Sequence, residues 1–372
     1  MDDFQKILGE IWEGKRKSPV IRILFILLFL LSLPYGLVVA LRNLLYDLGV
    51  CRQRKLSCPV ISVGNITAGG TGKTPTVIML AKLLKENGFR PAVLSRGYGG
   101  ESRREINTVS DGHNVLMNSR EVGDEPFLMA QALKGVPVIT GVRRYLTGSY
   151  AVKELKADVL LLDDGFQHRA LYRDLDIVLA DSSRPFSNGR LLPCGRLRES
   201  LKGLRRADMI VLTGNDPDGK LKMPSMPDSF PYGKERIFRA FHKPLHMIRA
   251  DGGDILTLDC LKGKKIFAFA GIGNPRSFIR TIEMLHADLT GFFPFSDHQV
   301  FSREDIETIR KRASESKAEL IMTTEKDGVR LLDFPDFMRE IVMLHVEMSI
   351  VERGEEFADL ILSKLRKGVL QA

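Results

Sequence analysis

Residues 60–75 read VISVGNITAGGTGKTP and join an apolar run to a glycine-rich turn and a helix-forming segment. The run from Val60 to Val63 is typical of a buried strand, and residues 75–85 are expected to form a helix. A strand, a glycine-rich turn and a helix in this order point successive backbone N–H groups and the positive end of the helix toward one place. The stretch therefore predicts a phosphate-binding loop.

The loop residues are expected to contact a nucleotide: Thr67, Ala68, Gly69, Gly70, Thr71, Gly72, Lys73 and Thr74. Lys73 is placed to reach the outer phosphates, and the Thr74 hydroxyl is placed to hold Mg²⁺. The general motif has a glycine where this chain has Thr67, so the match departs from it at one position. A tight turn without a ligand is the alternative, and the flanking strand and helix favour the phosphate-binding loop.

The rest of the chain alternates apolar runs with helical stretches, which predicts a mostly parallel α/β sheet. Strands are expected at residues 91–95, 136–140, 159–163, 176–180, 209–213, 266–270, 289–295, 320–323 and 341–346. Helices are expected at residues 126–133, 143–155, from 275 onward and at 303–313. Gly271 to Asn274 weakly matches a dinucleotide-binding fingerprint, and a plain strand–helix turn is the favoured interpretation.

A length of 372 residues suggests two domains, and residues 215–233 are rich in Pro, Gly, Asp and Ser. We therefore predict an N-terminal helical segment (1–45), a P-loop core domain (46–214), a linker (215–234) and a second, smaller α/β domain (235–372). The net charge of +9 favours an anionic partner, and no recognisable nucleic-acid-binding module accompanies it. Four cysteines without metal-ligand spacing predict reduced thiols and no zinc site.

The N-terminal region contains 19 uncharged residues, Ile23 to Leu41, between basic flanks. As a helix this segment would be about 28 Å long, close to the thickness of a hydrocarbon core. Pro34 and Gly36 are expected to kink or break it. A cleaved signal peptide is disfavoured because no cleavage site follows. A buried core helix is an alternative, and we favour membrane contact, either spanning or lying in the interface.

Three further groups of residues are candidates for chemistry. The apolar strand from Val159 ends in Asp163 and Asp164, an arrangement that delivers a carboxylate to Mg²⁺, and one of the two is expected to face the metal. Asp124 stands at a predicted helix start, where it could be a helix cap, and His298 stands in a polar loop. Other polar residues that could meet a ligand lie in the loop after Asp164 and in an arginine-rich run: Gln167, His168, Arg169, Asn188 and Arg190.

Seven stretches in one order between residues 64 and 327 resemble the tetraacyldisaccharide 4'-kinase family, membrane-associated kinases of lipid A biosynthesis. The string Asp-Asp-Gly-Phe-Gln-His-Arg is the most specific of them. Thr67, which departs from the general phosphate-loop motif, resembles the variant of that loop found in this family. The stretches are residues 64–75, 95–99, 123–126, 163–169, 188–193, 297–298 and 324–327.

The resemblance implies transfer of the ATP γ-phosphoryl group to the 4'-hydroxyl of a tetraacylated glucosamine disaccharide 1-phosphate, an anionic glycolipid. By the match, Lys73 and Thr74 hold phosphates and Mg²⁺, Asp124 is the general base and His298 is its partner from the second domain. Asp164 is favoured over Asp163 as the metal carboxylate. The family works at the cytoplasmic face of the bacterial inner membrane, which implies a monotopic protein or a single N-terminal anchor here.

Two other function classes stay open at this point. A membrane-attached P-loop ATPase that acts as a switch or positioning factor would explain the loop and the apolar segment, but it leaves Asp124 and His298 without a role. A lipid-binding scaffold without catalysis would not need the Gly-Lys-Thr sequence.

Overall fold

A computed structural model describes residues 2–12, 14, 18–214, 226–228, 230–251 and 253–369. Within these residues, thirteen strands form one continuous sheet in the order β11-β10-β12-β13-β8-β7-β6-β1-β5-β2-β4-β3, with β9 paired to β8. The pairs β3–β4, β8–β13 and β8–β9 are antiparallel and the remaining neighbours are parallel. The predicted mostly parallel α/β fold is confirmed.

The first half of the chain builds one side of this sheet around the buried strands β1 and β5, whose residues are all buried. Such continuous apolar runs are typical of parallel strands covered on both faces. Its elements are β1 (Val60–Asn65), α3 (Lys73–Glu86), β2 (Pro91–Ser95), β3 (Asn107–Ser110), α4 (Ser119–Val122), α5 (Asp124–Ala132), β4 (Val138–Thr140), α6 (Arg144–Lys153), β5 (Val159–Asp163), β6 (Leu175–Asp181) and β7 (Met209–Thr213).

The second half continues the sheet from β8, a 13-residue strand. The sequence analysis did not predict β8, because its pattern mixes buried and half-buried positions and contains Pro244, which stands at a register shift opposite Val346. Its elements are β8 (Ile237–Arg249), β9 (Ile255–Leu256), β10 (Lys265–Ala270), α7 (Pro275–Met284), β11 (Asp288–Pro294), α8 (Arg303–Glu315), β12 (Leu320–Thr324), α9 (Glu325–Arg330), α10 (Pro335–Met338), β13 (Ile341–Ile350) and α11 (Gly354–Val369).

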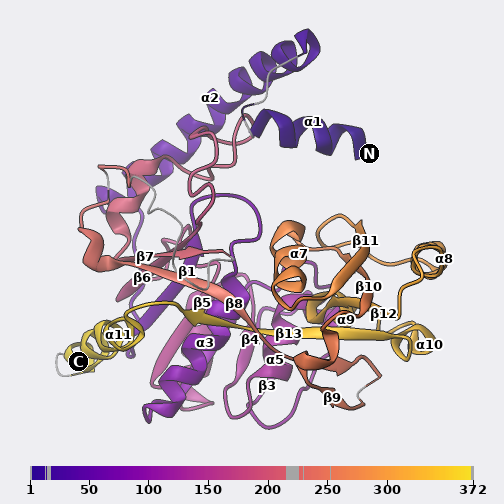
Figure 1. Cartoon of the computed structure of the whole chain (residues 1–372). Helices are drawn as coiled ribbons and strands as arrows, with labels where there is room; N and C mark the ends of the chain where they lie inside the picture. Colours follow the sequence, from indigo (N-terminus) through magenta and orange to yellow (C-terminus); the bar gives the residue numbers. More distant parts are fainter. Residues whose placement is uncertain are drawn as a thin grey trace.

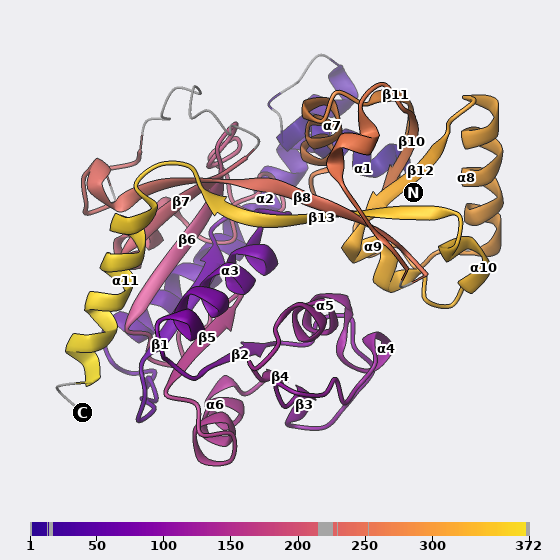
Figure 2. The ribbon, with the colours of Figure 1, turned by 60° about the horizontal axis from the view of Figure 1, so that its bottom comes forward.

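Strands β8 and β13 join the two halves, as Figure 2 shows. β8 pairs with β7 through Ile237–Ala240 and with β13 along its remaining length. After β13 the chain returns to the first half, where α11 packs into the same hydrophobic core as α3 through Phe357 and Ile361. The domain limits stay a prediction, and most of the expected linker (215–225 and 229) lies outside the described residues.

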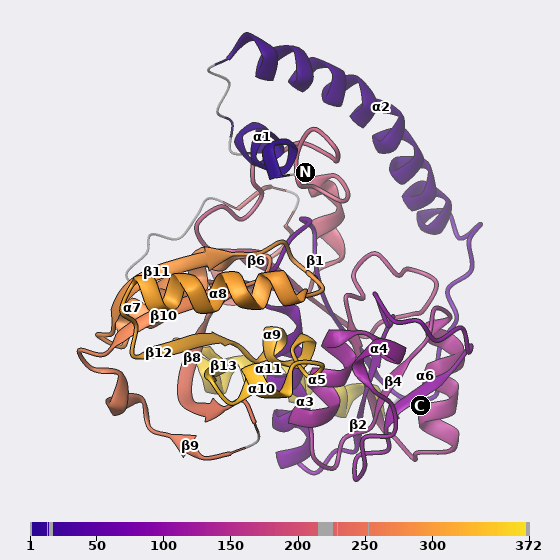
Figure 3. The same ribbon diagram turned by 90° about the vertical axis from the view of Figure 1, so that its right-hand side faces the viewer.

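Two helices precede the sheet: α1 (Asp2–Trp12) and α2 (Pro19–Asp47), which project from one side of it (Figure 1). α2 is one continuous helix across Pro34, so the expected break is absent from this described segment. Figure 3 shows that the helix curves along its length. Pro34 has no N–H to donate to the preceding turn, and a gradual bend of the helix accommodates this missing hydrogen bond. α2 has the length and apolar composition of a membrane-crossing helix, and most of its large apolar side chains are exposed.

Candidate functional site

The phosphate-binding loop lies between β1 and α3, and its conformation is fixed by polar contacts from the sheet. Gly72 has φ +77°, a left-handed conformation that favours glycine, and α3 begins at the next residue, Lys73. The Asn65 side chain donates hydrogen bonds to the Gly69 carbonyl (3.3 Å) and to Thr71 Oγ1 (2.9 Å). The N–H groups of the first turn of α3 are thus free to meet an anion.

The start of the loop faces a second segment of the chain. The Ala68 N–H donates to the Arg196 carbonyl (2.7 Å), and the Arg198 N–H donates to the Ile66 carbonyl (2.8 Å). Thr67 pairs with Leu197 in an isolated antiparallel bridge. Residues 196–198 therefore act as a short strand that holds this side of the loop.

The two carboxylates at the end of β5 have different surroundings. Asp163 is buried, and one of its oxygens accepts a hydrogen bond from Ser95 Oγ (3.0 Å) while Oδ1 has no partner among the described residues. Asp164 accepts hydrogen bonds from Arg198 on both oxygens (2.9 Å each), and its Oδ1 lies 3.8 Å from Lys73 Nζ. Asp164 has φ +50°, a left-handed conformation that is uncommon for residues other than glycine but that aspartate adopts more often than most.

The surroundings also separate the acidities of these carboxylates. Burial, with the nearby Glu125 and Asp164 carboxylates, raises the pKa of Asp163 well above its usual value. Burial acts in the same direction on Asp164, but Lys73 and Arg198 outweigh it and lower the pKa of Asp164. Asp164 is ionised at neutral pH, and Asp163 is a buried oxygen donor that a cation would help to ionise.

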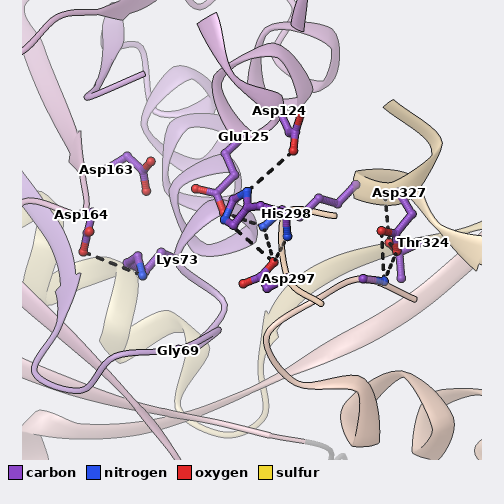
Figure 4. A network of polar contacts seen from close by, with 12 residues as sticks. Gly69, Lys73, Asp124, Glu125, Asp163, Asp164, Asp297, His298, Thr324 and Asp327 are labelled. Atoms are coloured by element: carbon purple, nitrogen blue, oxygen red, sulfur yellow. Dashed lines mark hydrogen bonds and ion pairs between the residues drawn. The ribbon is translucent and has the colours of Figure 1, made fainter. Parts of the chain in front are cut away.

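Asp124 begins α5 on the opposite side of the site and contacts His298 (Figure 4) and Arg330, both of the second half. Its Oδ2 lies 2.6 Å from Arg330 Nε and 3.7 Å from His298 Nδ1. Burial would raise the pKa of Asp124, but its contacts with His298 and Arg330 lower it overall. Lys326 forms a similar ion pair with Glu125 (2.9 Å), the residue after Asp124, and a second one with Asp297 (3.2 Å).

The turn between β10 and α7 also reaches the phosphate-binding loop. A Cβ atom on Gly273 would lie 2.5 Å from the Gly70 nitrogen, so this approach requires glycine. The Asn274 side chain donates to Asp181 at the end of β6 (3.2 Å). The interpretation of Gly271 to Asn274 as a strand–helix turn is confirmed, and the turn closes one edge of the site.

Together these elements surround a cleft of about 1280 Å³ between the two halves. Gly69 to Thr74, Asp163 and Asp164 line one side of it, and Asp297 and His298 line the other. Tyr98 lies at the rim, where its ring packs edge-on against His298 with 5.6 Å between the ring centroids. The cleft holds a phosphate-binding loop, two carboxylates and His298, which contacts Asp124 of the first half.

Known proteins are similar to this chain in sequence and in fold. Residues 24–366 match the family described as tetraacyldisaccharide-1-P 4'-kinase. The tetraacyldisaccharide 4'-kinase of Syntrophus aciditrophicus is 45% identical, over 96% of this chain and 98% of that protein. The enzyme of the same name from Desulfotalea psychrophila is 42% identical, over 84% of this chain and 89% of that protein.

This chain belongs to the tetraacyldisaccharide 4'-kinase family. It is therefore a member of a family of ATP-dependent lipid A kinases. The crystal structure of the "apo" form of LpxK from Aquifex aeolicus in complex with ATP resembles it with a TM-score of 0.71 and 35% identity, over 90% of this chain and 97% of that one. The family match begins within α2 and ends within α11, so both belong to the shared architecture.

Within this 4'-kinase fold, several predicted residues do not line the cleft. Thr67 and Ala68 face residues 196–198, as described above. Asp124 is not among the lining residues, but its partly exposed carboxylate contacts His298, and both His298 and Glu125 line the cleft. The five residues suggested for the substrate are also absent from the lining: Gln167, His168, Arg169, Asn188 and Arg190.

These five residues instead connect the loops of the core with each other and with the N-terminal helices. Arg169 is buried and binds Asp47 of α2 (2.7 Å), and Arg190 stacks over Phe25 and Phe29 of the same helix. Contact with substrate stays a prediction for them. The remaining three have contacts of their own: Gln167 donates to the Asn65 carbonyl (2.9 Å), Asn188 donates to the Cys194 carbonyl (3.1 Å), and burial with nearby arginines lowers the pKa of His168 to about 4.

The sequence analysis assigned no role to three cations that the 4'-kinase fold brings to this site. Arg198 binds Asp164, Lys326 binds Glu125, and Arg330 binds Asp124. Arg198 was one of many arginines in a basic run, and Arg330 lies three residues after the stretch 324–327, outside it. Only the three-dimensional approach of distant segments distinguishes them.

Proposed function

We propose that this chain transfers the γ-phosphoryl group of ATP to the 4'-hydroxyl of a tetraacylated glucosamine disaccharide 1-phosphate. The observation that carries the proposal is the position of His298, which lines the cleft opposite the phosphate-binding loop and lies 3.7 Å from the Asp124 carboxylate. An ATPase that acted only as a switch would need no proton acceptor for an alcohol on that side. Phosphoryl transfer depends mainly on positioning and charge neutralisation, and this cleft provides groups for both.

The roles of the residues follow from their surroundings. Lys73, at the first turn of α3, neutralises the outer phosphates together with the loop N–H groups. Asp124 accepts the proton of the attacking hydroxyl, and its lowered pKa keeps it ionised at neutral pH. His298 orients Asp124 from the second half, so turnover requires the two halves to be in contact.

Thr74, Asp163 and Asp164 fit a magnesium ion that accompanies the nucleotide. No cluster of three carboxylate, His or Cys ligands occurs among the described residues, but Mg²⁺ bound with a nucleotide needs only one or two carboxylates beside the phosphates. Asp163 Oδ1 is a buried oxygen without a partner in that part of the chain, whereas both oxygens of Asp164 accept from Arg198. These contacts support Asp163 as the direct ligand and Asp164 as a group that orders Lys73. When bound, Mg²⁺ would offset the negative charge of the phosphates.

The test is incubation of the purified protein with [γ-³²P]ATP, Mg²⁺ and detergent-dispersed disaccharide 1-phosphate lipid, followed by thin-layer chromatography. Label in a bisphosphorylated lipid, with none from the Lys73→Ala variant, is the expected result. Release of inorganic phosphate without labelled lipid would instead make the chain a switch ATPase.

We further propose that α2 holds the enzyme at the cytoplasmic face of the bacterial inner membrane, as a monotopic protein or through a single anchor. Leu27, Leu30 and Leu31 are each more than half exposed and lie on adjacent turns of this helix. Exposed apolar residues in such number are typical of a membrane-contacting surface. Substrate acyl chains in the bilayer would then lie near the active site.

Replacement of these three leucines by serine is expected to weaken binding to anionic phospholipid vesicles by at least about tenfold, because burial of each leucine contributes roughly 1.5–3 kcal/mol. Vesicle co-sedimentation measures the effect. Serine at three exposed apolar positions in the second half, Ile255, Val300 and Leu332, is the matched control and should leave binding unchanged. Equal loss in both variants would contradict the role of α2.

The contact between Arg330 and Asp124 predicts a change in pH dependence. The Arg330 cation lowers the pKa of Asp124, so the Arg330→Gln variant should have a higher pKa at the base. The acid limb of the kcat/KM profile is therefore expected to move to higher pH. The exposed Arg339, paired with Asp336, offers the control Arg339→Gln, which should keep the wild-type profile. An unchanged acid limb in Arg330→Gln would show that this ion pair does not tune the base.

A further inference from the structure

Helix α2 contacts the nucleotide site as well as exposing an apolar surface. Large apolar side chains are exposed along its whole length, and its second part, from Tyr35 to Asp47, also makes polar contacts with loops of the core. The Tyr35 hydroxyl donates a hydrogen bond to the Arg198 carbonyl (2.7 Å). Arg198 is the residue whose guanidinium binds both oxygens of Asp164.

The contacts continue from Asp164 to the phosphate-binding loop. Lys73 Nζ lies 3.8 Å from Asp164 Oδ1, so the chain of contacts Tyr35, Arg198, Asp164, Lys73 begins on α2 and ends at the first residue of α3. The Arg198 N–H binds the Ile66 carbonyl, which fixes the same residue against the loop. Arg198 is therefore held on one side by the loop and on the other by α2.

A second set of contacts runs from α2 through the fully buried Glu199. Asn43 Nδ2 donates to Glu199 Oε2 (3.0 Å), and Arg206 donates to both Glu199 oxygens (2.8 and 2.9 Å). Gln167 donates both to Glu199 (3.1 Å) and to the carbonyl of Asn65, the last residue of β1. A buried carboxylate with several donors fixes the relative positions of the elements that supply them.

We propose that α2 orders the nucleotide site, with Tyr35 as a positioning residue that acts through Arg198 on Asp164 and Lys73. The inference rests on the proposed function and deepens it, because the helix that contacts the membrane would also hold the phosphate-binding groups. Loss of the Tyr35 hydroxyl frees the Arg198 carbonyl and loosens the segment that carries the guanidinium. The affinity for nucleotide then falls, and the affinity for the lipid does not.

The experiment compares the full-length wild-type protein with Tyr35→Phe and Tyr46→Phe in detergent micelles. Tyr46 lies on the same helix, and its ring stacks on Arg169, an arrangement that phenylalanine keeps. Fluorescence of an N-methylanthraniloyl ATP analogue with Mg²⁺ gives the nucleotide dissociation constant, and the kinase assay gives KM for the lipid. Tyr35→Phe should raise the dissociation constant by about fivefold, as loss of one hydrogen bond predicts, with the lipid KM within about twofold of wild type. Tyr46→Phe should match the wild type.

Repeating the comparison in an Arg198→Ala background tests the route. If Tyr35 acts through Arg198, Tyr35→Phe should have no further effect on nucleotide affinity there. Unchanged nucleotide affinity in Tyr35→Phe, the same loss in both backgrounds, or a raised lipid KM alone would overturn the inference. Because the binding measurement needs no lipid, it stays informative even if the wild-type protein labels no lipid, the result that would overturn the proposed function alone.

Discussion

The Lys73→Ala variant is expected to lose both nucleotide binding and turnover. Lys73 is mostly buried at the start of α3, where its ammonium group lies beside Asp164 at the edge of the cleft. No other lysine of the described chain occupies the first turn of that helix, so no neighbour can replace it. Removal of one charge that stabilises the transferring phosphoryl group costs about 10²–10³-fold in kcat, and loss of ground-state phosphate contacts lowers affinity as well.

Steady-state kinetics and nucleotide titration measure the two effects separately. Lys85→Ala is the matched control, because Lys85 lies on the same helix but is not among the residues that line the cleft, and its ammonium group donates to the Lys134 carbonyl. This control should keep both activity and affinity. A Lys73→Ala variant with wild-type affinity for ATP would remove the phosphate-binding interpretation of the loop.

The phosphate-binding loop could be predicted from the sequence because its determinants are local. The apolar strand, the glycines and the helix start lie within sixteen consecutive residues, and each has a conformational preference of its own. Strand β5 and the carboxylates at its end could also be predicted, because their determinants are consecutive residues. Where neighbouring residues decide the structure, periodicity and residue type are sufficient.

Elements that depend on distant partners could not be predicted in this way. β8 is a strand because β7 and β13 flank it, although its own sequence contains a proline and half-buried polar residues. The approach of Arg330 to Asp124 joins residues 206 positions apart, and the contact of Tyr35 with Arg198 joins residues 163 positions apart. A residue that acts across such a separation looks in the sequence like any other arginine or tyrosine.

The Asp124→Asn variant is expected to lose turnover and keep its affinity for ATP. Asparagine has the size of aspartate and can still accept a hydrogen bond from Arg330, but it cannot take a proton from the acceptor hydroxyl. General base catalysis contributes about 10²–10⁴-fold, so kcat should fall by that factor. The affinity for ATP should stay within about twofold, because Asp124 contacts His298 and Arg330 of the second half and is not part of the phosphate-binding loop.

This variant also separates catalysis from folding. Asp124→Asn removes one ionic partner of the buried Arg330, which also binds Asp327 (3.1 Å), so a thermal melt must show that the protein is folded before the rates are compared. Asp259→Asn removes an exposed carboxylate that pairs only with Lys262 and provides the control. If Asp124→Asn is folded, binds ATP and turns over at the wild-type rate, Asp124 is not the base.

If turnover is lost in that folded variant, the proton acceptor lies on α5 in the first half of the chain. The residues that orient it, His298 and Arg330, lie in the second half. Catalysis then requires contact between the two halves.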